Sequence, residues 1–169
     1  MRIALVQKDI VWGDPAANCH SVTGMLGLPG GDSSSPAGLK LGAVDLVVLP
    51  EMFSTGFATE PEGIAEDAPA SSLDFMKSMA ADLDAAVAGS IALHENGRYF
   101  NRFYFVKPDG AVEFYDKRHL FTYGGEDKRF TAGRERVVVE WRGVRFLLQV
   151  CYDLRFPVWY LTFQGLNNV

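Results

Sequence analysis

The chain has 169 residues, 48% of them hydrophobic, and a formal net charge of −5 at pH 7. This length and apolar content predict one domain with a sizeable core. The acidic balance offers no basic surface for nucleic acid, and no apolar run reaches the ~20 residues of a membrane span. The N-terminal apolar run is too short for a secretory signal, and the two distant cysteines, Cys19 and Cys151, make no disulfide framework. We therefore expect a cytoplasmic protein that binds neither nucleic acid nor a membrane.

The first part of the sequence predicts a strand, a helix and a second strand. Residues 3–6 form a continuous apolar run, typical of a strand covered on both faces. Asp-Pro at residues 14–15 supplies a capping oxygen and a proline at the first helical position, so we expect a helix over residues 15–28. A breaker-rich loop at residues 28–38 precedes a second buried strand at residues 44–49. This order implies a parallel pair of strands with a right-handed crossover.

The rest of the chain predicts one more helix and a series of hairpins. Ser72 can cap a helix whose apolar residues recur at helical spacing through Leu83. Asn-Gly at residues 96–97, Pro-Asp-Gly at residues 108–110 and Arg-Gly at residues 142–143 indicate tight turns. We count about seven strands and two helices, with a βαβ unit first and hairpins after it, which is a mixed α/β fold. The later strands are expected at residues 86–93, 98–106, 111–115, 136–141 and 144–150.

Three reactive side chains each follow an apolar run. These are Glu51, Lys117 and Cys151. A cysteine that attacks a carbonyl needs a base or a lowered pKa, because the thiolate is the nucleophile, and it needs a donor for the oxyanion. A glutamate can take the thiol proton, and a lysine can stabilise the oxyanion. We therefore expect the three to converge at one sheet edge and to carry out acyl transfer from an amide, although an isolated cysteine usually just packs.

Three blocks of sequence resemble the catalytic blocks of the nitrilase-like carbon–nitrogen hydrolases. They are LPEMF at residues 49–53, YDKRHLF at residues 115–121 and VCYDLRFP at residues 150–157, in the family's order and at about its spacing. Further matches are Asn-Arg at residues 101–102 and Ala-Gly at residues 132–133. Within the family, the blocks are most similar to the omega-amidase branch. That branch hydrolyses the side-chain amide of 2-oxoglutaramate and 2-oxosuccinamate and releases ammonia.

The resemblance implies a role for each matching residue. Glu51 would be the general base, Cys151 the nucleophile that forms a thioester, and Lys117 the group that stabilises the tetrahedral intermediate. The backbone N–H of Tyr152 would be a second oxyanion donor, and Glu126 matches a further glutamate of the family. The implied substrate is a small-molecule amide, and the resemblance implies neither a metal nor a cofactor.

The resemblance also implies an αββα sandwich, usually a homodimer joined through the helices after the nucleophile. The family pattern stops after Trp159, so we interpret residues 1–169 as a carbon–nitrogen hydrolase domain that is incomplete at its C-terminus. Two hypotheses of different classes follow. The chain is an omega-amidase-like hydrolase in shortened form, or it is an inactive remnant that acts as an interaction protein.

Other residues near these blocks have two interpretations. His119 could pair with Cys151 in a Cys–His hydrolase, whereas the family motif favours a structural role for it. Asp153 and Arg155 are expected to pair with each other and shape the turn rather than touch the substrate. The aromatic side chains that could line the pocket, or equally belong to the core, are Phe53, Phe57 and Tyr123.

Overall fold

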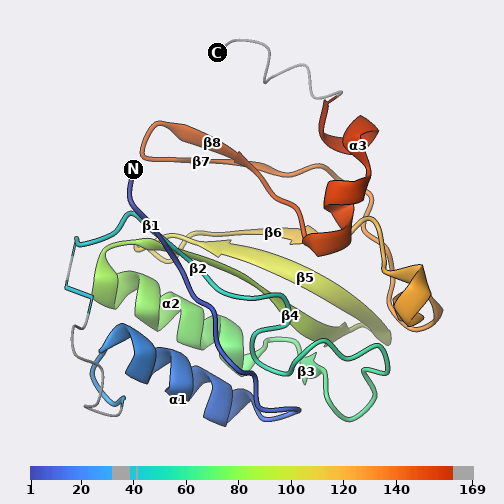
Figure 1. The fold of residues 1–169 in the computed structure, drawn as a ribbon, viewed down its shortest axis with the longest axis horizontal. Coiled ribbons are helices and arrows are strands. Elements are labelled where there is room, and N and C mark those ends of the chain that lie inside the picture. Colours follow the sequence, from blue (N-terminus) through green and yellow to red (C-terminus); the bar gives the residue numbers. More distant parts are fainter. Residues whose placement is uncertain (32–38, 41, 162–169) are drawn as a thin grey trace.

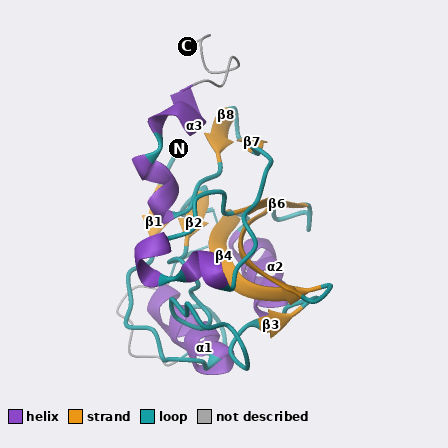
Figure 2. Cartoon of the chain, turned by 90° about the vertical axis from the view of Figure 1, so that its right-hand side faces the viewer, coloured by secondary structure: helices purple, strands orange, loops and turns teal. Residues whose placement is uncertain are grey.

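The computed structural model describes residues 1–31, 39–40 and 42–161. It is built in three layers (Figure 1). Helices α1 (Pro15–Leu26) and α2 (Ser71–Leu83) cover one face of a six-stranded sheet, and a two-stranded sheet packs against the other face. Figure 2 shows the same order of layers from the side. The mixed α/β class is therefore confirmed, and the described residues supply three of the four layers of an αββα sandwich.

The described strands number eight, one more than the sequence predicted. The additional strand, β3, has only two residues, both polar, so it lacks the alternation of apolar and polar residues that marks a strand. Helix α3 (Pro157–Leu161) was not predicted either, because five residues are too few to show a helical period. Residues 32–38 of the expected breaker-rich loop lie outside the described residues. The strands are β1 (Ile3–Leu5), β2 (Leu46–Val48), β3 (Glu66–Asp67), β4 (Ala86–Glu95), β5 (Arg98–Val106), β6 (Val112–Asp116), β7 (Val138–Trp141) and β8 (Val144–Leu147).

The large sheet has the order β1-β2-β4-β5-β6, with β3 paired to β4 off this path. Strands β1, β2 and β4 are parallel neighbours, as the βαβ order predicted. Strand β5 is antiparallel to β4, and β6 is antiparallel to β5. Strands β2, β4 and β6 therefore run in the same direction, and their carboxyl ends share one edge of the sheet.

Helix α1 begins and ends on the residues that its sequence indicates. The Asp14 carboxylate accepts a hydrogen bond from the Ala17 N–H at 2.9 Å, and Pro15 occupies the first turn. Gly27 ends the helix in the left-handed region at φ 63°. The expected cap is confirmed, and the helix stops two residues earlier than predicted.

The expected cap of helix α2 by Ser72 is wrong. The helix starts after Ala70, and its first turn is capped from outside by Glu66 of β3. The Glu66 carboxylate accepts hydrogen bonds from the Ser72 N–H at 2.9 Å and the Ser71 hydroxyl at 3.0 Å. A carboxylate there also faces the positive end of the helix dipole. The predicted apolar face of α2 is buried in the core as expected.

Both predicted two-residue hairpin turns are confirmed. Asn96 and Gly97 connect β4 to β5 with φ values of 51° and 73°, and Arg142 and Gly143 connect β7 to β8 with φ values of 47° and 77°. Two successive positive φ values match the twist of antiparallel strands. The sequence thus locates both hairpins correctly.

The core has one part on each face of the large sheet. One cluster joins α1 and α2 to the sheet, and a second fills the space between the two sheets. Strand β1 was expected to be covered on both faces, which is wrong. Ile3 is 49% exposed and Leu5 is 77% exposed, because no described element covers their side of this edge strand. Among the described residues, no helix is long and apolar enough to cross a membrane.

Candidate active site

A cavity of about 730 Å³ contains the three reactive side chains that the sequence singled out. Glu51 follows β2, and Lys117 follows β6, so both stand at the edge where the parallel strand ends meet. Cys151 follows β8 of the second sheet and begins the short 3₁₀ helix Cys151–Arg155. The cavity is lined by Glu51, Phe57, Lys117, Phe121, Cys151, Tyr152, Leu154 and Arg155.

The turn that carries Cys151 has an unusual backbone. Its φ is 43°, a left-handed value that is uncommon for a residue other than glycine. Met52, next to Glu51, also has a positive φ of 46°. Such conformations persist only where the surroundings impose them, and they cluster at functional sites. The exposed thiol of Cys151 is therefore held at a defined position at the cavity.

Lys117 is completely buried between two carboxylates. Its Nζ donates to Glu51 Oε1 at 2.7 Å and to Glu126 Oε2 at 2.9 Å, and it lies 5.4 Å from the centre of the Phe57 ring. Burial works to lower the pKa of Lys117, but the charges and hydrogen bonds of Glu51 and Glu126 outweigh it and raise that pKa. Lys117 is therefore a fixed cation at neutral pH.

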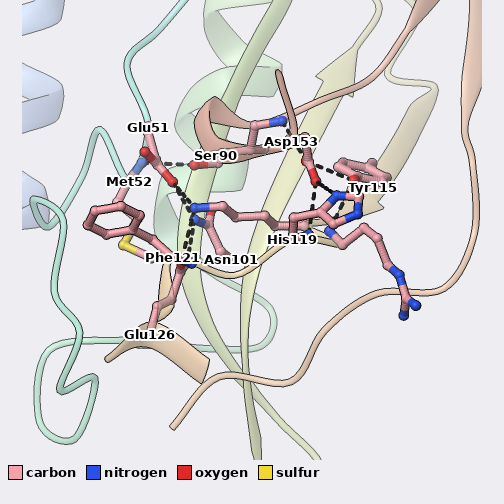
Figure 3. Close-up of polar contacts among 12 residues, drawn as sticks. Glu51, Met52, Ser90, Asn101, Tyr115, His119, Phe121, Glu126 and Asp153 are labelled. Carbon is pink, nitrogen blue, oxygen red and sulfur yellow. Dashed lines mark hydrogen bonds and ion pairs between the residues drawn. The ribbon is translucent and has the colours of Figure 1, made fainter. Parts of the chain in front are cut away.

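Glu126 lies in the 3₁₀ helix Glu126–Lys128 and has no exposed surface. Three donors occupy its carboxylate: Lys117 Nζ, the Phe121 N–H at 2.6 Å and the Asn101 side-chain amide at 3.0 Å. Figure 3 shows the Asn101 side chain between Glu51 and Glu126. A carboxylate with so many donors is suited to holding the lysine in place.

The thiol of Cys151 is protonated at rest. Partial burial raises its pKa, and the charge and hydrogen bond of Glu51 raise it further, while Lys117 acts in the opposite direction. A thiol in this state needs a base before it can act as a nucleophile. Glu51 is the carboxylate that interacts with it most strongly.

Two of the expected pocket aromatics lie elsewhere. Phe53 is fully buried in the main core, with its ring centroid 6.3 Å from that of Phe75, so it does not line the cavity. Tyr123 is 87% exposed and is also absent from the lining. Phe57 does line the cavity, together with Phe121, which sequence reasoning missed. The sequence contains 12 phenylalanines, and nothing in their order along the chain shows which of them face a cavity and which face the core.

Asp153 was expected to pair with Arg155, and this is wrong. The buried Asp153 carboxylate instead accepts hydrogen bonds from the Tyr115 hydroxyl at 2.8 Å and from the Val150 N–H at 3.0 Å. His119 Nδ1 lies 2.7 Å from an oxygen of this carboxylate. The His119 ring stacks on the Phe156 ring, with 3.8 Å between the ring centroids. Arg155 lines the cavity instead, which sequence reasoning also missed.

The Cys–His alternative gains no support from this geometry. The ring of His119 is engaged by Asp153 and does not belong to the lining of the cavity that contains Cys151. Among the described residues, no group of three His, Cys, Asp or Glu side chains is arranged to hold a metal ion. The cavity thus combines a thiol, a carboxylate and a buried cation, the set that acyl transfer from an amide requires.

The comparisons with known proteins agree with this geometry. The pattern of the carbon-nitrogen hydrolase family matches residues 2–165. The omega-amidase YafV of Escherichia coli K12 is 43% identical over 162 residues, which are 94% of this chain and 57% of that protein. The omega-amidase YafV of Yersinia enterocolitica is 42% identical over 161 residues, with the same shares covered. XC1258 of Xanthomonas campestris, a CN-hydrolase superfamily protein solved with an arsenic adduct in its active site, has a TM-score of 0.84 and 44% identity, covering 94% of this chain and 56% of that one.

The fold and the site together define a class of protein: layered α/β proteins with a glutamate, a lysine and a cysteine clustered at a sheet edge. The chain belongs to the carbon-nitrogen hydrolase family. The resemblance stated from the sequence is confirmed, including its likeness to proteins named omega-amidase. The chain spans little more than half the length of these curated relatives, 57% in each case.

Proposed function

We propose that the chain carries the catalytic residues of an omega-amidase-like hydrolase, which cleaves the amide of a small 2-oxo acid amide and releases ammonia. The observation that carries this proposal is the meeting of Glu51, Lys117 and Cys151 at one cavity, in a chain whose relatives are named omega-amidase. The reaction needs a nucleophile, a base and an oxyanion donor, and the cavity offers candidates for all three roles.

In the first half of the reaction, the Glu51 carboxylate takes the proton of the Cys151 thiol. The sulfur then bonds to the amide carbon, and the carbonyl oxygen becomes an oxyanion. The Lys117 ammonium and the backbone N–H of Tyr152 donate to that oxygen. Glu51 next gives its proton to the amide nitrogen, the carbon–nitrogen bond breaks, and ammonia leaves a thioester on Cys151.

In the second half, water replaces the departed ammonia. Glu51 takes one proton from the water as the water oxygen bonds to the thioester carbon, and a second oxyanion forms against the same two donors. The carbon–sulfur bond then breaks, the thiolate recovers a proton from Glu51, and the carboxylic acid leaves. The single base thus acts four times, as proton acceptor and donor in each half.

Arg155 supports an anionic substrate. It lines the cavity together with the apolar side chains of Phe57, Phe121 and Leu154. An arginine guanidinium can bind a carboxylate with two parallel hydrogen bonds, which fixes its orientation. A 2-oxo acid amide carries such a carboxylate at the end opposite its amide, so the site suits this substrate class.

The test is ammonia release from 2-oxoglutaramate by purified protein. We expect turnover that is lost in Cys151→Ala and kept in Cys19→Ala, because Cys19 lies outside the cavity lining. A neutral primary amide of the same length is the matched substrate, and it should be hydrolysed more slowly because it lacks the carboxylate. No ammonia release with either substrate, or equal release by the Cys151→Ala variant, would contradict the proposal.

A further inference from the structure

Asn101 joins the two carboxylates of the site. It lies in β5, opposite Ala92 of β4, and has no exposed surface. Its side-chain Nδ2 donates to Glu51 Oε1 at 2.7 Å and to Glu126 Oε1 at 3.0 Å (Figure 3). Lys117 Nζ donates to the same two carboxylates. Lys117 and Asn101 therefore hold both carboxylates, one as a charged donor and the other as a neutral donor, and Glu126 also accepts from the Phe121 N–H.

The direction of the Asn101 amide follows from electrostatics. If the amide were turned over, its oxygen would face two carboxylates, and acceptor would meet acceptor. In the present direction the Oδ1 atom is buried and has no hydrogen-bond partner among the described residues. A buried unpaired acceptor weakens folding. The oxygen of Asn101 thus destabilises the fold, while the two N–H groups of its side chain donate hydrogen bonds to Glu51 and Glu126.

A neutral donor has a specific advantage at this point. Glu51 and Glu126 share one cation, Lys117, so the cluster keeps a net negative charge beside the thiol. A second cation in place of Asn101 would offset that charge but would weaken Glu51 as a base. An amide stabilises both carboxylates without changing the net charge. Both donors to Glu51 end on Oε1, which leaves Oε2 to receive the thiol proton.

We propose that Asn101 is a positioning residue of the reaction, which orients Glu51 toward Cys151 and holds two carboxylates together beside one lysine. This inference rests on the proposed function, since it assigns a base to Glu51. A purely structural asparagine would tie β5 to neighbouring loops and affect stability alone. A positioning asparagine also sets the pH dependence of the site.

The experiment compares Asn101→Ser with Asn18→Ser. Asn18 is the matched control, because it is also fully buried and its side chain bonds Lys8, Val11 and Ser54, outside the cavity lining. Both substitutions remove an amide and should lower the melting temperature. Asn101→Ser should also lower kcat about 10–100-fold with KM little changed.

The decisive readout is the pH profile of kcat/KM. A carboxylate that loses a hydrogen-bond donor holds its proton to higher pH, so the acid limb should move up by about 0.5–1 pH unit in Asn101→Ser. It should not move in Asn18→Ser. If Asn101→Ser loses only stability, as Asn18→Ser does, with an unchanged acid limb, the inference is overturned.

A second readout needs no substrate and so separates this inference from the proposed function. Alkylation of Cys151 by iodoacetamide, followed by peptide mass spectrometry, should shift to higher pH in Asn101→Ser. The charged groups around the thiol, Glu51, Glu126, Lys117 and Arg155, are all unchanged in that variant, so any shift comes from the lost donor.

The outcomes are distinguishable. A shifted alkylation profile in a protein that releases no ammonia would support the role of Asn101 and contradict the proposed function. Ammonia release, with both pH profiles unchanged in Asn101→Ser, would support the proposed function and contradict the role of Asn101. If Asn101→Ser does not fold, Asn101→Asp keeps the shape and replaces the donor by an acceptor. It should shift the alkylation profile in the same direction and further, and an unshifted profile would overturn the inference.

Discussion

The Cys151 thiol and the Glu51 carboxylate depend on each other. Glu51 raises the pKa of the thiol through its charge and its hydrogen bond, after the larger effect of burial, and Lys117 acts in the opposite direction. The same carboxylate that suppresses the thiolate at rest is the group that can create it when substrate is present. Activity and reactivity toward a simple alkylating agent should therefore respond in opposite directions when Glu51 is changed.

We expect Glu51→Gln to abolish ammonia release and yet to speed alkylation of Cys151 at pH 7 by about three- to tenfold. The reason is that the negative charge is removed while the Lys117 cation remains, which lowers the pKa of the thiol. Iodoacetamide kinetics at the Cys151 peptide measure this. Glu126→Gln is the control and should have a smaller effect, because Glu126 contributes least to the shift of the thiol. Slower alkylation in Glu51→Gln would show that this residue favours the thiolate.

At the scale of elements, the segment after the 3₁₀ helices is pressed against the end of β6. The Gly133 N–H donates to the Lys117 carbonyl oxygen at 3.0 Å. A Cβ added to Gly133 would lie 2.0 Å from the Asp116 carbonyl oxygen and 2.7 Å from its carbonyl carbon, both of which are backbone atoms. This contact explains why the residue after Ala132 is a glycine. It also ties the position of Lys117 to the segment that contains Gly133.

We expect Gly133→Ala to lower the free energy of unfolding by about 1–3 kcal/mol, as overpacking does, and to reduce kcat because the displaced strand end carries Lys117. Urea unfolding and ammonia release measure the two effects. Gly110→Ala is the control: its φ is 84° and a Cβ there meets no atom within 4 Å, so it strains the backbone far from the cavity and should leave kcat unchanged. Equal kcat in both variants would show that the Gly133 contact does not position Lys117.

At the scale of the whole molecule, apolar surface is left uncovered on edge strand β1 of the large sheet and on β8 of the two-stranded sheet. Ile3 and Leu5 of β1 are 49% and 77% exposed, and Val144 of β8 is 40% exposed. Burial contributes about 25 cal/mol per Å², and an unpaired edge strand with apolar side chains favours association. Glu51, Lys117 and Cys151 meet at the cavity, whereas apolar side chains of β1 and β8 are left exposed.

We therefore expect the isolated 169-residue protein to be self-associated or of low stability. Light scattering after size exclusion should give a mass above that of a monomer, and Leu5→Lys, which places a charge on the edge strand, should reduce association. Lys107→Leu, a change at a site distant from this edge, should not reduce it. A soluble wild-type monomer that melts cooperatively would contradict this expectation.

The sequence alone determined the features that depend on consecutive residues. Asp14 and Pro15 start a helix, and Asn96 and Gly97 form a turn, because the interactions involved span only a few residues. The three motif blocks likewise identified the family and brought Glu51, Lys117 and Cys151 forward as candidates, since the type of residue and its order along the chain are visible without a structure.

Only the tertiary structure decided which atoms meet. Glu66 rather than Ser72 caps α2, Phe53 points into the core, and Asp153 bonds Tyr115 across 38 positions of sequence. The amide of Asn101 lies between carboxylates that are 50 and 25 positions away. Such contacts depend on side-chain directions that are set when strands distant in sequence pack together, and no local pattern specifies those directions.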